Sequence, residues 1–154
     1  MKISTRGRYG MYAMLDLAIR EGLGPVTAVD IAGRQEISVT YLEQLLSKLK
    51  RAGFVKGVRG PGGGYQLKKS SGDIKIGDII RTLEGPIAPV FCLPKSLNRK
   101  RCPKTEYCAC FPLWKKLAES IEDVLDSATL EDLKRDAIAL QGSRKVEHDF
   151  VFNI

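Results

Sequence analysis

Apolar residues recur at helical spacing in three successive segments of the first third of the chain. The first segment covers about residues 4–21 and ends at Gly22, a residue type that stops helices. The second follows Thr27, a common N-cap residue, and reaches about Gln35. The third follows Ser38, another N-cap residue type, and continues to about Arg51. We expect the buried face of this third helix to comprise Val39, Leu42, Leu45, Leu46 and Leu49.

Two short segments with alternating apolar and polar residues come next, at residues 54–59 and 65–69. Between them lies Gly60-Pro61-Gly62-Gly63-Gly64, which predicts a tight hairpin tip. A further short helix is predicted over residues 77–83, packed back on the preceding elements. Helix, short turn, helix and glycine-tipped hairpin is the order of a winged helix-turn-helix domain, a DNA-binding fold.

The rest of the chain predicts a connection, two helices and a tail. Five prolines and all four cysteines fall between Gly85 and Pro112, which favours a loop. We therefore expect a mainly α protein with a small β-hairpin wing. Its predicted parts are a winged helix-turn-helix domain (1–84), a cysteine-bearing sensor loop (85–112), a long dimerisation helix followed by a short helix (113–140), and a tail (141–154).

The outward face of the third helix carries side chains that can recognise base edges. Glu43 can accept a hydrogen bond from cytosine N4, Gln44 can pair with adenine, and Thr40 can contact a base edge or a thymine methyl group. Lys48 and Arg51 lie further along and suit phosphates, which fix register without reading sequence. The helix is thus expected to contact DNA through Thr40, Tyr41, Glu43, Gln44, Lys48 and Arg51.

The hairpin is expected to supply a second DNA contact. Lys56 and Arg59 flank a tip that has almost no side chains, so its backbone can approach the sugar-phosphate wall closely. Arg59 is placed to enter a minor groove, where narrow A·T-rich tracts attract guanidinium groups. The tip does not match a nucleotide-binding P-loop, because a strand follows it and no Gly-Lys-Ser/Thr is present. The predicted contacts are Lys56, Arg59, Gly60, Gly62 and Gly63.

The charge distribution favours a polyanionic partner for the first part of the chain. The net charge is +7, and residues 1–82 alone have a balance of +7, whereas residues 111–154 have a balance of −3. No apolar run reaches the roughly 20 residues of a membrane span, and the first residues do not resemble a signal peptide, so we expect a cytoplasmic protein. The only histidine, His148, is remote from any nucleophile, which argues against an enzyme.

Three sequence motifs closely resemble the Rrf2 family of transcription regulators, and most closely its iron–sulfur cluster members. They are Met1–Tyr9 (MKISTRGRY), Ser38–Leu46 (SVTYLEQLL) and Val58–Tyr65 (VRGPGGGY). The resemblance covers residues 1 to about 135. It implies a homodimer on a palindromic operator, with a long helix crossing the partner. It also implies that Thr40, Glu43, Gln44 and Arg59 match the operator-reading positions.

Clustered cysteines in a cytosolic chain suggest metal or redox chemistry, because thiolates select iron–sulfur clusters, zinc or copper(I). By the resemblance, Cys102 and Cys108 match the second and third cluster ligands, and Cys92 would be the first, at a longer spacing than the family's. Phe111 stands where the nearest relatives have a histidine, and Cys110 is an extra thiol that can replace it. The candidate ligands are Cys92, Cys102, Cys108 and Cys110. Zinc, a direct thiol redox switch and a cofactor-free loop remain alternatives.

An apolar stripe on the helix that begins near residue 113 predicts a homodimer interface. Its members are Leu113, Leu117, Ile121, Val124 and Leu125.

The sequence supports two hypotheses for function. The first is a dimeric regulator of transcription, binding double-stranded DNA and gated by an iron–sulfur cluster or by cysteine oxidation. The second is a cluster-free regulator of the same family, controlled by docking of a metabolic enzyme or a small molecule, as in relatives that sense cysteine supply.

Overall fold

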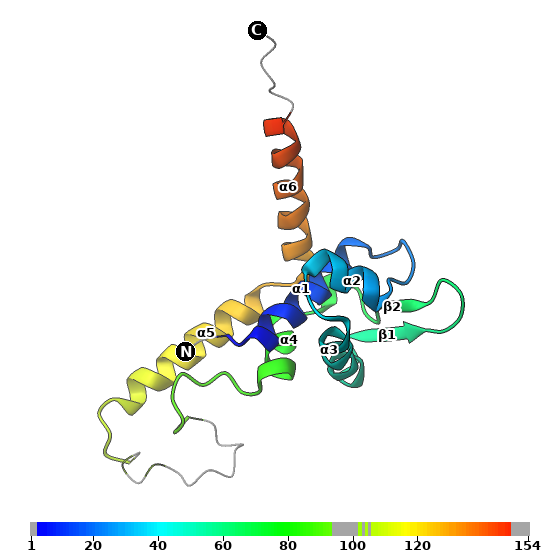
Figure 1. Ribbon diagram of the computed structural model, residues 1–154. Helices are drawn as coiled ribbons and strands as arrows, with labels where there is room; N and C mark the ends of the chain where they lie inside the picture. The colour runs from blue at the N-terminus through cyan, green and yellow to red at the C-terminus, as the bar shows by residue number, and fades with distance from the viewer. Residues whose placement is uncertain (1–2, 94–101, 103, 105, 149–154) are drawn as a thin grey trace.

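The computed structural model describes residues 3–93, 102, 104 and 106–148, with side chains up to residue 141. Helices α1 to α4 and the β1–β2 hairpin form one body, from which α5 and α6 extend in different directions (Figure 1). The elements are α1 (Thr5–Ile19), α2 (Ala28–Gln35), α3 (Val39–Arg51), β1 (Val55–Val58), β2 (Gly64–Leu67), the 3-10 turn η1 (Ser71–Asp73), α4 (Ile76–Glu84), α5 (Phe111–Ser127) and α6 (Leu130–His148).

Each of the first three helices begins with a side-chain N-cap. For α2 and α3 the capping residues are Thr27 and Ser38, as the sequence predicts. The Thr27 hydroxyl accepts a hydrogen bond from the Asp30 amide at 3.1 Å, and the Ser38 hydroxyl accepts one from the Tyr41 amide at 3.3 Å. Glu36 ends α2 in the left-handed region with φ 53°, so only a short turn separates the two helices. The body therefore contains the predicted helix-turn-helix pair.

The helix-turn-helix pair is tied to α1 through a buried carboxylate. Asp16 of α1 is 2 % exposed, and its carboxylate accepts hydrogen bonds from Arg34 Nε at 2.9 Å and Arg34 Nη2 at 2.7 Å. Arg20 donates to the same carboxylate at 3.0 Å, and Gln35 does so at 3.4 Å. Hydrogen bonding to Asp16 raises the pKa of Arg34. The last turn of α2, which sets where α3 begins, is thus fixed on α1.

The core lies where α1, α2, α3 and α4 meet, and it includes Leu42, Leu45, Leu46 and Leu49 of α3. These four leucines are at most 1 % exposed, as the apolar pattern predicts. Val39 is the exception, because its side chain is 37 % exposed and the predicted burial is wrong. Val39 is the first residue of α3, directly after the N-cap, and it lies at the end of the helix, outside the stretch whose leucines pack in the core.

The β1–β2 hairpin is anchored to the α1–α2 connection. Antiparallel pairing runs from Val55 opposite Leu67 to Val58 opposite Gly64. Val26 adds a bridge to Tyr65, with amide-to-carbonyl distances of 2.8 and 2.7 Å in the two directions. A Cβ on Gly64 would lie 2.3 Å from the Val26 carbonyl oxygen, and its φ of 155° also disfavours other residues. Glycine therefore allows the hairpin to approach the body this closely.

Helix α5 is held to α4 by an ion pair. Arg81 of α4 lies 2.6 Å from the Asp126 carboxylate of α5 and 2.9 Å from Asp78 on its own helix. Hydrogen bonding to Asp126, followed by that to Asp78, raises the pKa of Arg81. Gly77 leaves the space for this contact, since a Cβ there would lie 1.8 Å from an Asp126 oxygen. The C-terminal end of α5 is therefore joined directly to the winged-helix body.

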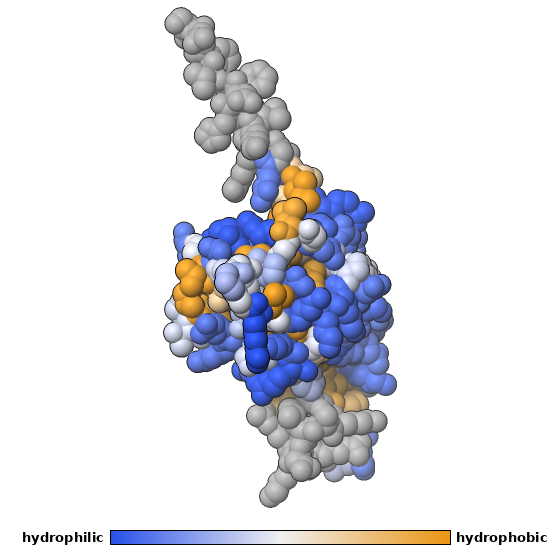
Figure 2. All heavy atoms as spheres, turned by 90° about the vertical axis from the view of Figure 1, so that its right-hand side faces the viewer, coloured by the Kyte–Doolittle hydropathy of each residue, from blue (hydrophilic) through white to orange (hydrophobic). Residues whose placement is uncertain are grey.

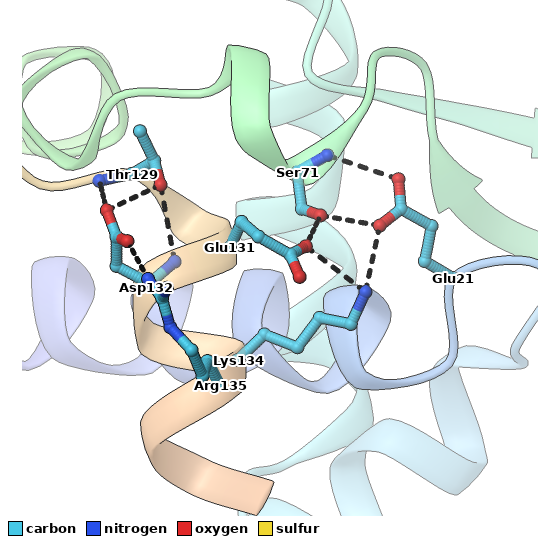
Figure 3. A network of polar contacts seen from close by, with 7 residues as sticks. All are labelled: Glu21, Ser71, Thr129, Glu131, Asp132, Lys134 and Arg135. Carbon is cyan, nitrogen blue, oxygen red and sulfur yellow. Dashed lines mark hydrogen bonds and ion pairs between the residues drawn. The ribbon is translucent and has the colours of Figure 1, made fainter.

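Helix α6 is attached to the body by a polar network centred on Ser71, shown in Figure 3. Ser71 is fully buried, and its hydroxyl lies 2.5 Å from the Glu21 carboxylate and also contacts Glu131 of α6. Lys134 donates to Glu21 at 3.3 Å and to Glu131 at 3.2 Å. The backbone also contributes, because Leu130 donates to the Ile74 carbonyl at 2.9 Å. The network joins the turn that follows α1, the 3-10 turn η1 and α6.

Because of this network, the free energy of unfolding should decrease at acid pH. Burial alone would raise the pKa of Glu21, but hydrogen bonds from Ser71 and Lys134 outweigh it and lower the pKa below 4.5. The Ser71 and Lys134 hydrogen bonds also lower the pKa of Glu131. Lowered carboxylate pKa values stabilise the folded state above about pH 4.5, and this stability is lost as the pH falls through the folded values.

Urea unfolding between pH 7 and pH 3 measures this contribution. We expect the wild type to lose more stability over this range than Ser71→Ala, because the variant lacks the hydroxyl that lowers both carboxylate pKa values. Ser70→Ala is the matched control, because Ser70 is an exposed neighbour that makes no side-chain cap to η1. Equal pH dependence of the wild type and Ser71→Ala would contradict the assignment.

Two C-terminal boundaries differ from the sequence prediction. Helix α5 begins at Phe111, inside the expected loop, because Pro112 is tolerated in a first helical turn. Helix α6 continues to His148, so the prediction of a short helix followed by a tail from residue 141 is wrong. The sequence of residues 141–148 has no apolar period, so it does not predict a helix there, but it also contains no proline that would end one. Residues 149–154 lie outside the described part of the chain.

Candidate nucleic-acid interface

The predicted base-reading side chains of α3 lie together on its solvent side. Thr40, Glu43 and Gln44 are all exposed, whereas the four leucines of the same helix face the core. Residues three and four apart lie on the same face of a helix, so these three side chains form one continuous polar surface near the N-terminus of α3. Such a surface at the start of a recognition helix suits insertion into a major groove.

Tyr41 and Lys48 are less exposed than the other predicted contacts on α3, because both also face α1. The Tyr41 ring meets the Tyr9 ring edge-on, with centroids 6.2 Å apart. Tyr41 and Lys48 line a cleft together with Ser4 of the α1 N-terminus. Arg51 ends α3 and is exposed. The structure therefore brings α1 alongside the predicted reading surface, which helical periodicity alone does not reveal.

The hairpin tip has the conformation that its glycines allow. Gly60 and Gly62 have φ values of 100° and 74°, and the Gly63 amide donates to the Gly60 carbonyl at 2.9 Å. A Cβ on Gly63 would lie 2.4 Å from the Val58 carbonyl oxygen, so the turn has no room for a larger residue there. The tip is a tight loop whose backbone is open to a close-fitting partner.

The predicted hairpin cations are both available to a partner. Lys56 and Arg59 are exposed, and no salt bridge within the described part of the chain involves either of them. Figure 2 looks onto the hairpin side of the molecule and shows mostly hydrophilic side chains over the body. Exposed cations on a polar, tight-tipped hairpin beside α3 are the arrangement expected of a winged helix that binds phosphate and groove.

The apolar stripe on α5 divides into two groups. Leu113, Leu117 and Val124 are exposed by 60, 42 and 68 %, which is unusual for large apolar side chains. Ile121 and Leu125 instead line an apolar cleft of the same chain, and Leu125 packs against the core. The outward group is the part of the stripe that remains without a covering element in the described chain.

The four predicted cysteine ligands lie between α4 and α5 but do not form a ready metal site. Within the described residues, no three His, Cys, Asp or Glu side chains lie close enough to hold a metal ion. Cys108 and Cys110 lie directly before α5, where their carbonyl oxygens accept hydrogen bonds from Phe111 at 3.0 Å and Trp114 at 3.1 Å. Only Cys108 and Cys110 therefore stand at the start of α5, and Cys92 and Cys102 lie earlier in the connection.

In the described part of the chain no helix is both long and apolar enough to cross a membrane.

Comparison with known proteins agrees with this arrangement. The Rrf2 family, described as iron-dependent transcriptional regulators, matches residues 3–136. The HTH-type transcriptional regulator CymR of Bacillus subtilis is 47 % identical over 133 residues, which cover 86 % of this chain and 89 % of that protein. The HTH-type transcriptional regulator IscR of Vibrio atlanticus is 39 % identical over 153 residues, which cover 99 % of this chain and 86 % of that protein.

A solved structure gives the same result at the level of the fold. The structure described as CymR, the global cysteine regulator of B. subtilis, superposes with a TM-score of 0.71 at 45 % identity, covering 88 % of this chain and 97 % of that one. The predicted mainly α fold with a hairpin wing is therefore confirmed, as is the resemblance on which the family assignment rests. The chain belongs to the Rrf2 family and is an HTH-type, DNA-binding transcriptional regulator rather than an enzyme.

Proposed function

We propose that the protein is a cytoplasmic homodimer that binds a palindromic DNA operator sequence-specifically and that its affinity is set by the thiols between α4 and α5. The observation that supports sequence-specific binding is the exposed surface of Thr40, Glu43 and Gln44 on α3. In the bound state α3 lies in the major groove, where Glu43 accepts from cytosine and Gln44 pairs with adenine. Arg59 enters the adjacent minor groove beside the glycine tip.

The remaining contacts position the protein without reading bases. Arg51 and Lys56 are exposed near the two ends of the α3–β1 connection, where they reach phosphates on either side of the groove. Backbone amides of the tip meet the sugar-phosphate wall, because the glycines there present no Cβ atoms. The contact set that we propose is Thr40, Tyr41, Glu43, Gln44, Lys48, Arg51, Lys56, Arg59, Gly60, Gly62 and Gly63.

The homodimer is proposed from the outward apolar residues of α5. Leu113, Leu117 and Val124 recur at spacings of four and seven residues, so they form one stripe that a second copy of α5 can cover. A two-fold dimer would present its two α3 helices to half-sites about one DNA turn, roughly 34 Å, apart. Ile121 and Leu125 would then complete the interface from its inner edge.

Selection from a random duplex library tests the DNA-binding part of the proposal. Purified protein is expected to enrich duplexes that carry two inverted half-sites about 10 base pairs apart, centre to centre. Enrichment of a single asymmetric site would argue against the dimeric arrangement. Retention of duplexes with no sequence preference would argue against base reading by α3.

The gate is proposed from the position of the thiols on the chain. The segment that carries them leads directly into α5, and α5 is joined to the winged-helix body by the Arg81–Asp126 ion pair. A change in the loop can therefore alter the spacing of the two α3 helices in a dimer and shift the population competent for DNA. Thiolates suit an iron–sulfur cluster, but the thiols must come together to hold one. When bound, a cluster would supply a redox- and iron-responsive group, held by Cys92, Cys102, Cys108 and Cys110.

A second candidate is a cluster-free regulator controlled by a docking metabolic enzyme or by a small molecule. One observation favours it: the relative at 47 % identity is CymR, called a global cysteine regulator. Both candidates share the same DNA-binding surface. They differ in whether the thiols themselves respond.

Purification without oxygen separates the two candidates. The thiol gate predicts iron and acid-labile sulfide in the protein, or a reversible thiol oxidation, and in either case a change in affinity for the selected duplex. Cys102→Ala should remove that change, and Ser127→Ala, an exposed residue at the far end of α5, should not. A colourless protein whose DNA affinity ignores iron, sulfide and oxidants would support the second candidate.

A further inference from the structure

A cleft of about 430 Å³ lies between the N-terminus of α1 and the solvent side of α3. Its α3 wall contains Gln44 and Lys48, which belong to the proposed DNA contacts. Its other wall is the first turn of α1, a region that no sequence motif assigns to DNA. The full lining is Ser4, Thr5, Arg6, Tyr41, Gln44, Leu45 and Lys48.

The charged side chains of this cleft are both cationic. Arg6 and Lys48 line it, and no Asp or Glu does. Arg6 Nε is buried, yet it has no hydrogen-bond acceptor within the described part of the chain. A buried guanidinium nitrogen without an acceptor is costly, and such a group is normally satisfied by a partner or a ligand. The cleft therefore offers positive charge that the described chain leaves unused.

The backbone amides at the start of α1 also favour an anionic ligand. The first amides of a helix have no intrahelical acceptor. The Gly7 amide is capped by the Ser4 hydroxyl at 3.4 Å, whereas the Thr5 and Arg6 amides have no acceptor among the described residues. Together with the hydroxyl groups of Thr5 and Tyr41, the cleft is lined by hydrogen-bond donors, and a helix N-terminus adds positive potential.

We propose that this cleft binds a phosphodiester of the operator backbone, with Arg6 as its principal ligand. This inference rests on the proposed function, because it takes α3 to lie in the major groove. Gln44 and Lys48 line the same cleft, so a phosphate held there would be adjacent to the bases that α3 reads. The contact would fix how far α3 enters the groove, and it would carry no sequence information of its own.

The test uses a duplex obtained by selection with the wild-type protein, and it compares the wild type with Arg6→Gln. The slope of log affinity against log salt is negative, and loss of one phosphate contact per half-site should reduce its magnitude by about 1 for each half-site, or about 2 for a dimer. Binding should weaken by the same factor on the selected duplex and on its single-base-pair variants. Arg6→Lys should restore the slope, because it keeps the charge. Arg8→Gln is the matched control, because Arg8 is exposed two residues further along α1 and does not line the cleft.

Neutral methylphosphonates placed one at a time in the duplex locate the contact. We expect one position in each half-site at which neutralisation weakens the wild type but leaves Arg6→Gln unchanged. An unchanged salt slope in Arg6→Gln, or wild-type and variant proteins equally sensitive at every position, would overturn the proposal. A third result would also overturn it: the wild type and Arg6→Gln bind DNA equally well, and inorganic phosphate raises the melting temperature of the wild type alone. The cleft would then bind free phosphate rather than the DNA backbone.

The outcomes separate this inference from the proposed function. If the wild-type protein retains no duplex in the selection, the proposed function fails. If the wild type binds with base preference and Arg6→Gln binds with the same salt slope, only the phosphate site fails. The melting temperatures of all variants are measured alongside, so that a folding defect in Arg6→Gln is recognised, and a second neutral variant, Arg6→Met, then carries the comparison.

Discussion

Leu117→Glu should convert the protein from a dimer to a monomer and lower its affinity for a duplex with two half-sites by at least about 100-fold. Leu117 is 42 % exposed on the outward stripe of α5, so the single chain tolerates the change. In a dimer the new carboxylate would be buried against its symmetry copy, where two like charges repel and neither is solvated. Light scattering gives the oligomeric state, and titration of the selected duplex gives the affinity.

The size of this effect comes from linking two binding events. Each monomer would hold one half-site, and the second half-site is bound at a high effective concentration only while the two copies stay together. Lys116→Gln is the matched control, because it changes the charge by the same amount on the neighbouring exposed position and should leave the dimer intact. A Leu117→Glu protein that remains dimeric would show that another surface joins the two copies.

Asp16→Ala should lower the free energy of unfolding by roughly 2–3 kcal/mol. The Asp16 carboxylate is 2 % exposed and accepts hydrogen bonds from Arg20 and Arg34, which lose their shared partner in the variant. The loss is expected to stay below the roughly 3–5 kcal/mol of a fully buried pair, because both arginines keep access to water. Urea unfolding at pH 7 measures the difference.

The same substitution should also weaken DNA binding, since Asp16 holds the end of α2 and thereby the start of α3. Asp73→Ala is the control, because Asp73 is exposed in η1 and none of the described side-chain hydrogen bonds involves it, so we expect a change within about 0.5 kcal/mol. If Asp16→Ala were as stable as the wild type, the α1–α2 anchor would not be a determinant of the fold.

The winged-helix body could be predicted from sequence because each of its elements carries a strong local pattern. Ser38 and the leucines of α3 mark both the start and the inner face of that helix, and the glycine run marks the hairpin tip. These patterns depend on residues close in the chain, and capping and periodicity express them directly. The same patterns left Thr40, Glu43 and Gln44 as the outward side chains of α3, which is where the structure places them.

The parts that the sequence did not predict depend on contacts between distant residues. Three such contacts join segments that no periodicity relates. They are the bridge from Val26 to Tyr65, the ion pair of Arg34 with Asp16, and the contacts of Ser71 with Glu21 and Glu131. The cleft beside α3 is of the same kind, because it exists only where the start of α1 meets Lys48. The length of α6 was missed for another reason: residues 141–148 have no apolar period in the sequence, so periodicity gives no sign that the helix continues.

The most direct test of the account is the base preference of Glu43→Ala. Wild type and variant are titrated with the selected duplex and with every single-base-pair variant of it. Base reading by α3 predicts that Glu43→Ala loses discrimination, worth about 1–3 kcal/mol in the wild type, at one symmetric position in each half-site, and keeps it at all others. If Glu43→Ala instead binds every duplex more weakly by one common factor, or keeps the full preference of the wild type, α3 does not read the operator in the way proposed here.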